Sequence, residues 1–157
     1  MTDRAEKAVA LLIEKKLTVT TAESCTGGLI ASALVDVAGV SEVYREGYIT
    51  YSNEAKEKLL GVRKETIEAH TEVSAETAAE MAEGAAGNAG ADLALSSTGI
   101  AGPGGGSAER PVGLVYLGLY DRGRIVTERH VFSGDRASVR SQAAAASIRM
   151  LYEALER

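Results

Sequence analysis

A chain of 157 residues that is 45% hydrophobic and 25% charged has the size and composition of one globular domain, so we expect a single domain over residues 1–157. A net charge of −5 argues against a main role in nucleic-acid binding, because phosphate-binding surfaces usually carry a basic excess. One cysteine excludes an internal disulfide, and no long apolar run follows the charged N-terminus, so we expect no signal peptide, no membrane span and a cytoplasmic location.

Apolar and β-branched residues recur with helical and strand periods along the chain. In chain order they predict a helix over residues 3–16, a strand over 17–20, a helix over 29–37, a strand over 47–51, helices over 54–60, 64–69 and 74–87, strands over 92–98, 113–120 and 125–132, and a helix from 136 to the C-terminus. Asp121-Arg122-Gly123 suits a hairpin turn. This order predicts an α/β fold, a three-layer α/β/α sandwich with a mixed central sheet.

The turn between the first strand and the second helix carries polar side chains and glycines: Ser24, Cys25, Thr26, Gly27 and Gly28. A strand that turns directly into a helix exposes its last side chains at the sheet edge and aims the free N–H groups of the first helical turn beyond them. The two glycines let another group approach this backbone closely. The pattern therefore predicts Ser24 or Cys25 as a nucleophile beside an anion or oxyanion pocket. The alternative is a helix start with Thr26 as its N-cap.

A second glycine-rich segment follows the expected strand over 92–98 and contains Gly99, Gly102, Gly104 and Gly105. Its glycine spacing does not match a dinucleotide fingerprint, and a strand follows where that motif needs a helix. No Gly-Lys-Ser/Thr sequence is present, so it is not a phosphate loop of that kind. A loop at the carboxyl end of a central strand is a usual ligand site, and the alternative is a flexible surface connection.

Few side chains in this chain can act as a general base. His70 and His130 are the two histidines, and with one cysteine they give neither a metal-ligand spacing nor an evident triad. With Asn53 as N-cap, Lys56 falls in the first turn of a helix, where the dipole and partial desolvation lower a lysine pKa. A neutral lysine can deprotonate a serine, and Tyr51 ends the strand before it. The alternative for Lys56 is a solvated helix lysine.

Two arginines near the start of the last helix, Arg136 and Arg140, lie four residues apart and therefore on one face. Together with helix N–H groups they suit the binding of a phosphate. The alternative is a salt bridge to Asp135 or Glu128.

Several long motifs occur in an order that resembles the CinA C-terminal domain family. They are Thr21–Gly28 (TAESCTGG), Tyr51–Lys56 (YSNEAK), Thr98–Pro103 (TGIAGP), Pro111–Gly113 and Gly134–Arg136. The resemblance spans nearly the whole chain. It implies an amidase that hydrolyses the carboxamide of nicotinamide mononucleotide to nicotinic acid mononucleotide and ammonia, within pyridine nucleotide recycling.

The resemblance also implies residue roles and partners. The resemblance makes Ser24 the catalytic nucleophile and Lys56 its base, acting directly or through the catalytic Tyr51. Thr98 falls on a threonine of the substrate pocket. Cys25 then becomes a packing residue whose backbone N–H helps an oxyanion hole. A small nucleotide is the implied substrate, with no metal or other cofactor, no nucleic acid and no membrane, and a homodimer is left open.

The sequence departs from the family pattern in two places. Tyr44-Arg45-Glu46-Gly47 stands where members commonly read Phe-Glu-Arg-Gly, and no role is assigned to that pair of charges. Many relatives carry a separate N-terminal domain of molybdopterin-binding type, which this sequence lacks, so the stand-alone amidase form is expected. Two other functions stay open: a catalytically inactive nucleotide-binding or regulatory module, and a thiol hydrolase that uses Cys25.

Overall fold

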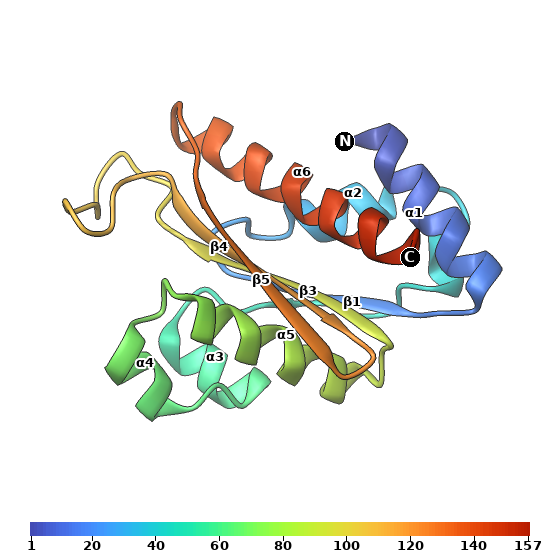
Figure 1. Cartoon of the computed structure of the whole chain (residues 1–157), viewed down its shortest axis with the longest axis horizontal. Helices are drawn as coiled ribbons and strands as arrows, with labels where there is room; N and C mark the ends of the chain where they lie inside the picture. Colours follow the sequence, from blue (N-terminus) through green and yellow to red (C-terminus); the bar gives the residue numbers. More distant parts are fainter.

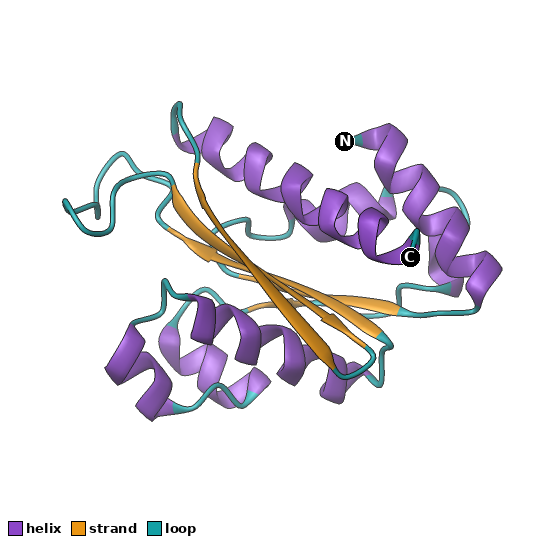
Figure 2. Cartoon of the chain, in the orientation of Figure 1, coloured by secondary structure: helices purple, strands orange, loops and turns teal.

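The computed structural model describes residues 1–157 and contains a five-stranded sheet between two layers of helices (Figure 1; Figure 2). The sheet order is β2-β1-β3-β4-β5. Strand β1 runs parallel to β2 and β3, whereas β4 is antiparallel to both of its neighbours. The mixed sheet predicted from the order of the elements is therefore confirmed. The strands are β1 (Val19–Glu23), β2 (Tyr48–Ile49), β3 (Leu93–Gly99), β4 (Leu114–Asp121) and β5 (Arg124–Val131).

The helices divide between the two faces of the sheet, as the three-layer prediction requires (Figure 1). One face is covered by α1 (Thr2–Lys15), α2 (Leu29–Val35) and α6 (Arg136–Leu155), with the short 3₁₀ helix η1 (Val40–Glu42) after α2. The other face is covered by α3 (Asn53–Leu60), α4 (Lys64–His70) and α5 (Ala75–Ala89). None of these helices combines the length and the apolar character needed to cross a membrane.

Apolar side chains form a separate core on each side of the sheet. The larger core, of 24 buried residues, lies under α1, α2 and α6. The smaller one, of 8 residues, lies under α5, whose alanines let the helix approach the strands closely. Gly84 on α5 also permits close packing against α3, because a Cβ at this position would clash with the carbonyl oxygen of Leu60. The sheet edge that carries the carboxyl ends of β1 and β3 is thereby flanked by helices from both layers.

The first two strands differ from the sequence-based prediction. β1 extends through Glu23 instead of ending at residue 20, because its residues pair with β3 along the whole segment. β2 is confined to Tyr48 and Ile49 instead of residues 47–51, because only Ala22 and Glu23 of β1 pair with it. Beyond that short ladder, the chain turns directly into α3.

The start of α3 is also displaced by one residue from the prediction. Ser52, not Asn53, is the N-cap, since its side chain accepts a hydrogen bond from the Ala55 amide. Lys56 is then the fourth residue of the helix and still lies in its first turn. The helix ends at Gly61, whose φ of 68° is the left-handed conformation typical of a helix C-terminus.

Candidate active site

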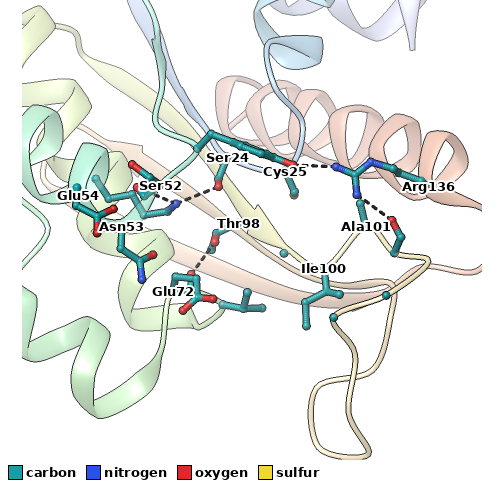
Figure 3. Close-up of a pocket in the computed structure, with 17 residues that line it drawn as sticks. Ser24, Cys25, Ser52, Asn53, Glu54, Glu72, Thr98, Ile100, Ala101 and Arg136 are labelled. Carbon is teal, nitrogen blue, oxygen red and sulfur yellow. Dashed lines mark hydrogen bonds between the residues drawn. The ribbon is translucent and has the colours of Figure 1, made fainter.

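A cavity of about 470 Å³, lined mostly by polar residues and glycines, lies at the carboxyl ends of β1 and β3 (Figure 3). Open α/β sheets usually bind ligands at this edge. The cavity walls come from the turn after β1, the start of α3, the loop before α5, the glycine-rich loop after β3 and the first residue of α6. Five segments that are far apart in the sequence therefore meet there.

Glu23 organises the turn that carries the predicted nucleophile. Its buried carboxylate accepts hydrogen bonds from the amides of Gly28 (3.1 Å), Ile30 (2.9 Å) and Ala31 (3.0 Å) and from the Thr26 hydroxyl (2.6 Å). The prediction that Thr26 caps α2 is therefore wrong, because its hydroxyl donates to Glu23 instead of accepting from a helix amide. The prediction of free first-turn N–H groups is also wrong for these three amides, because a carboxylate already occupies them.

The same turn keeps few amides available for an oxyanion. The Gly27 amide donates to the Ser24 carbonyl (3.1 Å), and the Gly28 amide donates to Glu23. The amides of Cys25 and Thr26 donate to no backbone carbonyl of the chain. Of these two residues, Cys25 lines the cavity.

Lys56 and Ser24 form the central contact of the site. Lys56 Nζ donates to Ser24 Oγ at 3.0 Å and to the Thr50 carbonyl at 2.9 Å, and the Ser52 carbonyl lies at 3.5 Å. Lys56 is only 1% exposed, so the alternative of a solvated helix lysine is wrong. Burial lowers the pKa of Lys56 below its ordinary value, and the nearby Glu72 carboxylate partly opposes that change. A lysine of this kind loses its proton more readily than an exposed one.

Tyr51 lines the cavity but does not join this pair. Its hydroxyl accepts a hydrogen bond from Arg136 Nη2 at 2.8 Å, and no hydrogen bond connects it to Ser24 or Lys56. Arg136 Nη1 donates to the Gly102 carbonyl at 2.8 Å. Arg136 therefore bridges the loop after β3 and the end of the segment before α3, and it forms the cationic side of the cavity (Figure 3).

Arg140 lies apart from Arg136 although both begin the same helix. Its Nε donates to the Cys25 carbonyl (2.9 Å) and its Nη2 donates to the Thr26 carbonyl (3.0 Å). It holds the nucleophile turn and does not line the cavity. The structure therefore brings only one of the two predicted phosphate ligands to the cavity, because one helical turn moves the second arginine under the neighbouring loop. Neither arginine forms a salt bridge with Asp135 or Glu128.

The glycine-rich loop and the strand before it form the opposite wall. Gly99 and Gly102 line the cavity, as predicted for a ligand-binding loop. Thr98 also lines it, and its hydroxyl donates to the Glu72 carbonyl at 2.6 Å. Gly27 and Gly28 lie in the turn behind the cavity wall and do not line it, because the carboxylate that caps α2 draws this part of the turn toward the helix.

Both histidines are outside the site. His130 Nε2 contacts Glu128 at 2.8 Å on β5, and His70 lies 3.8 Å from Glu76. Burial raises the pKa of the Cys25 thiol to about 11, which keeps it protonated and a poor nucleophile. A serine–lysine pair is therefore the arrangement in this cavity best suited to nucleophilic chemistry.

No role was assigned from the sequence to two acidic residues in and around the site, Glu23 and Glu72. Glu23 lies inside the TAESCTGG motif, and a carboxylate that ends a buried strand just before a helix is a signal that could have identified it. Glu72 lies in the short loop between α4 and α5 and lines the cavity, but no spacing or motif in the sequence marks it.

The family model described as the CinA C-terminal domain matches residues 1–155. The chain belongs to the CinA C-terminal domain family. A CinA-like protein of Kosmotoga olearia is 55% identical to it over 150 residues, which are 96% of this chain and 36% of that protein. A competence-damage inducible protein of Clostridium acetobutylicum is 57% identical over 133 residues, which are 85% of this chain and 32% of that protein. The chain thus spans about a third of the length of these curated CinA relatives.

Solved CinA structures have the same fold. The competence/damage inducible protein CihA from Agrobacterium tumefaciens superposes with a TM-score of 0.96 at 42% identity, covering 99% of this chain and 95% of that one. A CinA superfamily protein from Klebsiella pneumoniae gives a TM-score of 0.95 at 39% identity, covering 99% and 97% of the two chains. The family and the α/β fold expected from the sequence motifs are thereby confirmed.

Proposed function

We propose that this protein is an amidase that hydrolyses the carboxamide of nicotinamide mononucleotide to nicotinic acid mononucleotide and ammonia. The observation that carries the proposal is the 3.0 Å contact between Lys56 Nζ and Ser24 Oγ, with Lys56 buried. A buried lysine within hydrogen-bond distance of a serine is an activated nucleophile pair, and it needs neither a histidine nor a metal.

In the proposed reaction, the neutral Lys56 amine accepts the proton of Ser24 as Oγ attacks the carboxamide carbon. The negative charge that develops on the carboxamide oxygen is stabilised by the amide of Cys25, a residue that lines the cavity and whose amide donates to no backbone carbonyl. Lys56 then passes its proton to the leaving nitrogen, and ammonia departs. Water, deprotonated by the same amine, attacks the acyl-serine ester and releases the carboxylic acid together with the free Ser24 hydroxyl.

The cavity supports a nucleotide-sized substrate. Its volume of about 470 Å³ falls within the range of small-molecule sites. Arg136 supplies a guanidinium on the wall away from Lys56, where a phosphate would be favoured. Tyr51 contributes to this end of the site by accepting a hydrogen bond from Arg136, and not as a proton relay.

The decisive experiment is an ammonia-release assay with purified protein and nicotinamide mononucleotide, with the product identified as nicotinic acid mononucleotide. Turnover by the wild type and its loss in Ser24→Ala would support the proposal. Binding of the nucleotide without release of ammonia would instead establish the alternative of a nucleotide-binding module.

A further inference from the structure

The loop that carries Glu72 has an unusual backbone. Thr71 adopts φ 69° and ψ 172°, a region that is sparsely populated by residues other than glycine and especially unfavourable for a β-branched side chain. Backbone strain of this kind persists only where the surrounding structure imposes it, and it is frequent at functional sites. The strained conformation of Thr71 therefore indicates that the surrounding structure holds this loop in one position, as is frequent at functional sites.

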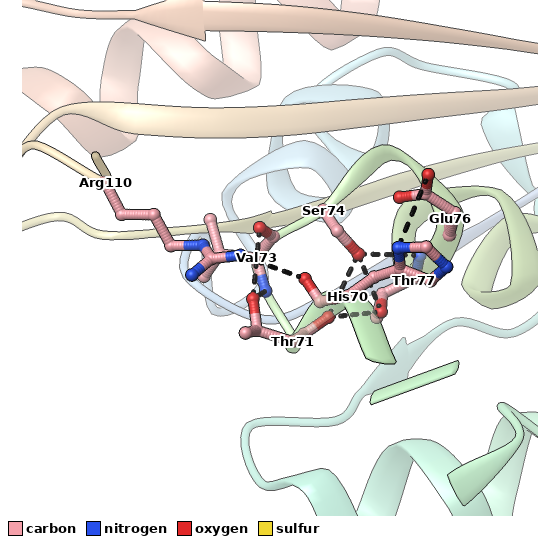
Figure 4. A network of polar contacts seen from close by, with 7 residues as sticks. All are labelled: His70, Thr71, Val73, Ser74, Glu76, Thr77 and Arg110. Atoms are coloured by element: carbon pink, nitrogen blue, oxygen red, sulfur yellow. Dashed lines mark hydrogen bonds and ion pairs between the residues drawn. The ribbon is translucent and has the colours of Figure 1, made fainter. Parts of the chain in front are cut away.

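A dense set of hydrogen bonds holds this strained conformation (Figure 4). The Thr71 carbonyl accepts from the hydroxyls of Ser74 (3.0 Å) and Thr77 (2.8 Å), both at the start of α5. The Thr71 hydroxyl contacts the backbone of Val73, and Thr98 of β3 fixes the Glu72 carbonyl from the opposite side. Contacts from the sheet and from α5 thus determine where the backbone of Glu72 lies.

The result of this arrangement is that Glu72 lines the same cavity as Ser24 and Lys56. Its side chain lies below Thr98 on the wall of the site (Figure 3). Among the carboxylates that act on Lys56, Glu72 has the largest effect, followed by Glu54. Because Lys56 Nζ contacts Ser24 Oγ, an acyl group on Ser24 is within electrostatic reach of the Glu72 carboxylate.

We propose that Glu72 is a specificity residue that makes the site prefer the neutral carboxamide of the substrate over the carboxylate of the product. This inference rests on the proposed amidase function. The two nucleotides carry the same ring charge and the same phosphate, so only the reacting group distinguishes them. A negative charge on the wall of the cavity that receives this group repels the product and leaves the neutral amide nearly unaffected.

The chemistry of the reaction explains why such a charge is useful. The newly formed acid gives up its proton, and the Lys56 amine beside it is a ready acceptor. The carboxylate would then face an ammonium group that attracts it and slows its release. The negative charge of Glu72 offsets this attraction, so the product leaves more readily.

The test compares equilibrium binding of both nucleotides to proteins that carry Ser24→Ala, so that no turnover occurs. Isothermal titration calorimetry gives the ratio of the product Kd to the substrate Kd. We expect Glu72→Gln, which removes the charge and keeps the shape, to lower this ratio about tenfold. Glu72→Asp should retain most of the discrimination. Glu83→Gln, an exposed α5 residue outside the cavity, should leave the ratio unchanged.

A second measurement uses the active enzyme. Glu72, Glu54 and Cys25 are the groups that raise the pKa of Lys56, and Arg136 is the cation that shares the cavity. Removing the Glu72 charge lowers the pKa of Lys56, so the acid limb of the kcat/KM profile should move to lower pH in Glu72→Gln.

The outcomes separate the two proposals. An unchanged Kd ratio and pH profile in Glu72→Gln, with the wild type active, would overturn the role of Glu72 alone. A wild type that releases no ammonia would overturn the amidase function itself.

Discussion

At the residue scale, the site depends on Ser24 and Lys56, a serine paired with a buried lysine. Lysine is rarely found in a protein interior, because its ammonium loses hydration there without full compensation. Here Lys56 is almost completely buried. Its Nζ donates to the Ser24 hydroxyl and the Thr50 carbonyl, and the Ser52 carbonyl lies farther away, so none of its hydrogen-bond partners is a carboxylate. The absence of a paired acid keeps the neutral amine accessible, which is the form that a general base requires.

The nucleophile can be identified by comparing two neighbouring substitutions. Ser24→Ala should lower kcat by about three orders of magnitude or more, because no other activated nucleophile lies next to Lys56. Cys25→Ala should keep substantial activity, because burial raises the pKa of this thiol to about 11 and the proposed oxyanion donor is its backbone amide. Steady-state assays of both variants decide the matter. Activity lost only in Cys25→Ala would support the thiol hydrolase instead.

The protonation state of Lys56 should control the pH dependence of activity. Below its pKa the ammonium cannot accept the Ser24 proton, and above it the amine can, so kcat/KM should rise with pH. The midpoint should lie below 10.5, because burial lowers the pKa of Lys56. Lys56→Arg should be almost as damaging as Lys56→Ala, because arginine does not release its proton at these pH values. An active Lys56→Arg enzyme would show that only positive charge is needed.

At the element scale, the N-terminus of the short helix α2 is capped by a carboxylate of the preceding strand, β1. Glu23 ends β1, and its two oxygens accept from three amides at the start of α2. The nucleophile Ser24 lies between the strand and the helix, so both ends of its turn are anchored. Arg140 of α6 secures the same turn from the other side through the carbonyls of Cys25 and Thr26. The position of Ser24 is therefore a property of three elements and not of the turn alone.

Loss of the Glu23 carboxylate should destabilise the fold. Glu23→Ala leaves buried amides without a partner, and the expected decrease in the free energy of unfolding is about 2–4 kcal/mol. Glu23→Gln should cost less, because its amide oxygen still accepts a hydrogen bond. Denaturant unfolding followed by circular dichroism measures both, with the exposed Glu83→Ala as the control that stays within about 0.5 kcal/mol of the wild type. Equal stability of Glu23→Ala and the control would show that this cap contributes little.

At the scale of the whole molecule, the cavity is assembled across both helical layers. Lys56 comes from α3 below the sheet, Arg136 from α6 above it, and Ser24 from the sheet edge between them (Figure 1). A ligand that contacts Lys56 and Arg136 together therefore bridges the two layers. Such a geometry favours an elongated substrate with its reactive group at one end and its anionic group at the other.

Arg136 should act on binding more than on chemistry. Arg136→Ala removes the guanidinium proposed to bind the phosphate, so KM for nicotinamide mononucleotide should rise roughly ten- to a hundredfold. The dephosphorylated riboside should be affected little, because it lacks the group that Arg136 would recognise. Steady-state kinetics on both substrates test this expectation. An equal rise in KM for the two substrates would show that Arg136 does not bind the phosphate.

The sequence by itself determined most of the elements, the mixed α/β architecture and the family. Helical and strand periods and the Asp121-Arg122-Gly123 turn depend on residues close together in the chain, so local patterns are sufficient to predict them. The candidates Ser24 and Lys56 were also accessible, because each lies at a strand–helix junction and parallel strands bring such junctions to one edge.

Only the tertiary structure decided which side chains meet. Whether Arg136 or Arg140 faces the cavity, whether Tyr51 contacts Lys56 or Arg136, and whether a helix amide is free or held by Glu23 all depend on segments far apart in sequence. Glu72 has no local signal at all, and it reaches the site because α5 and β3 hold its loop against the cavity. Contacts of this kind follow from the packing of two helical layers on one sheet, which no short stretch of sequence specifies.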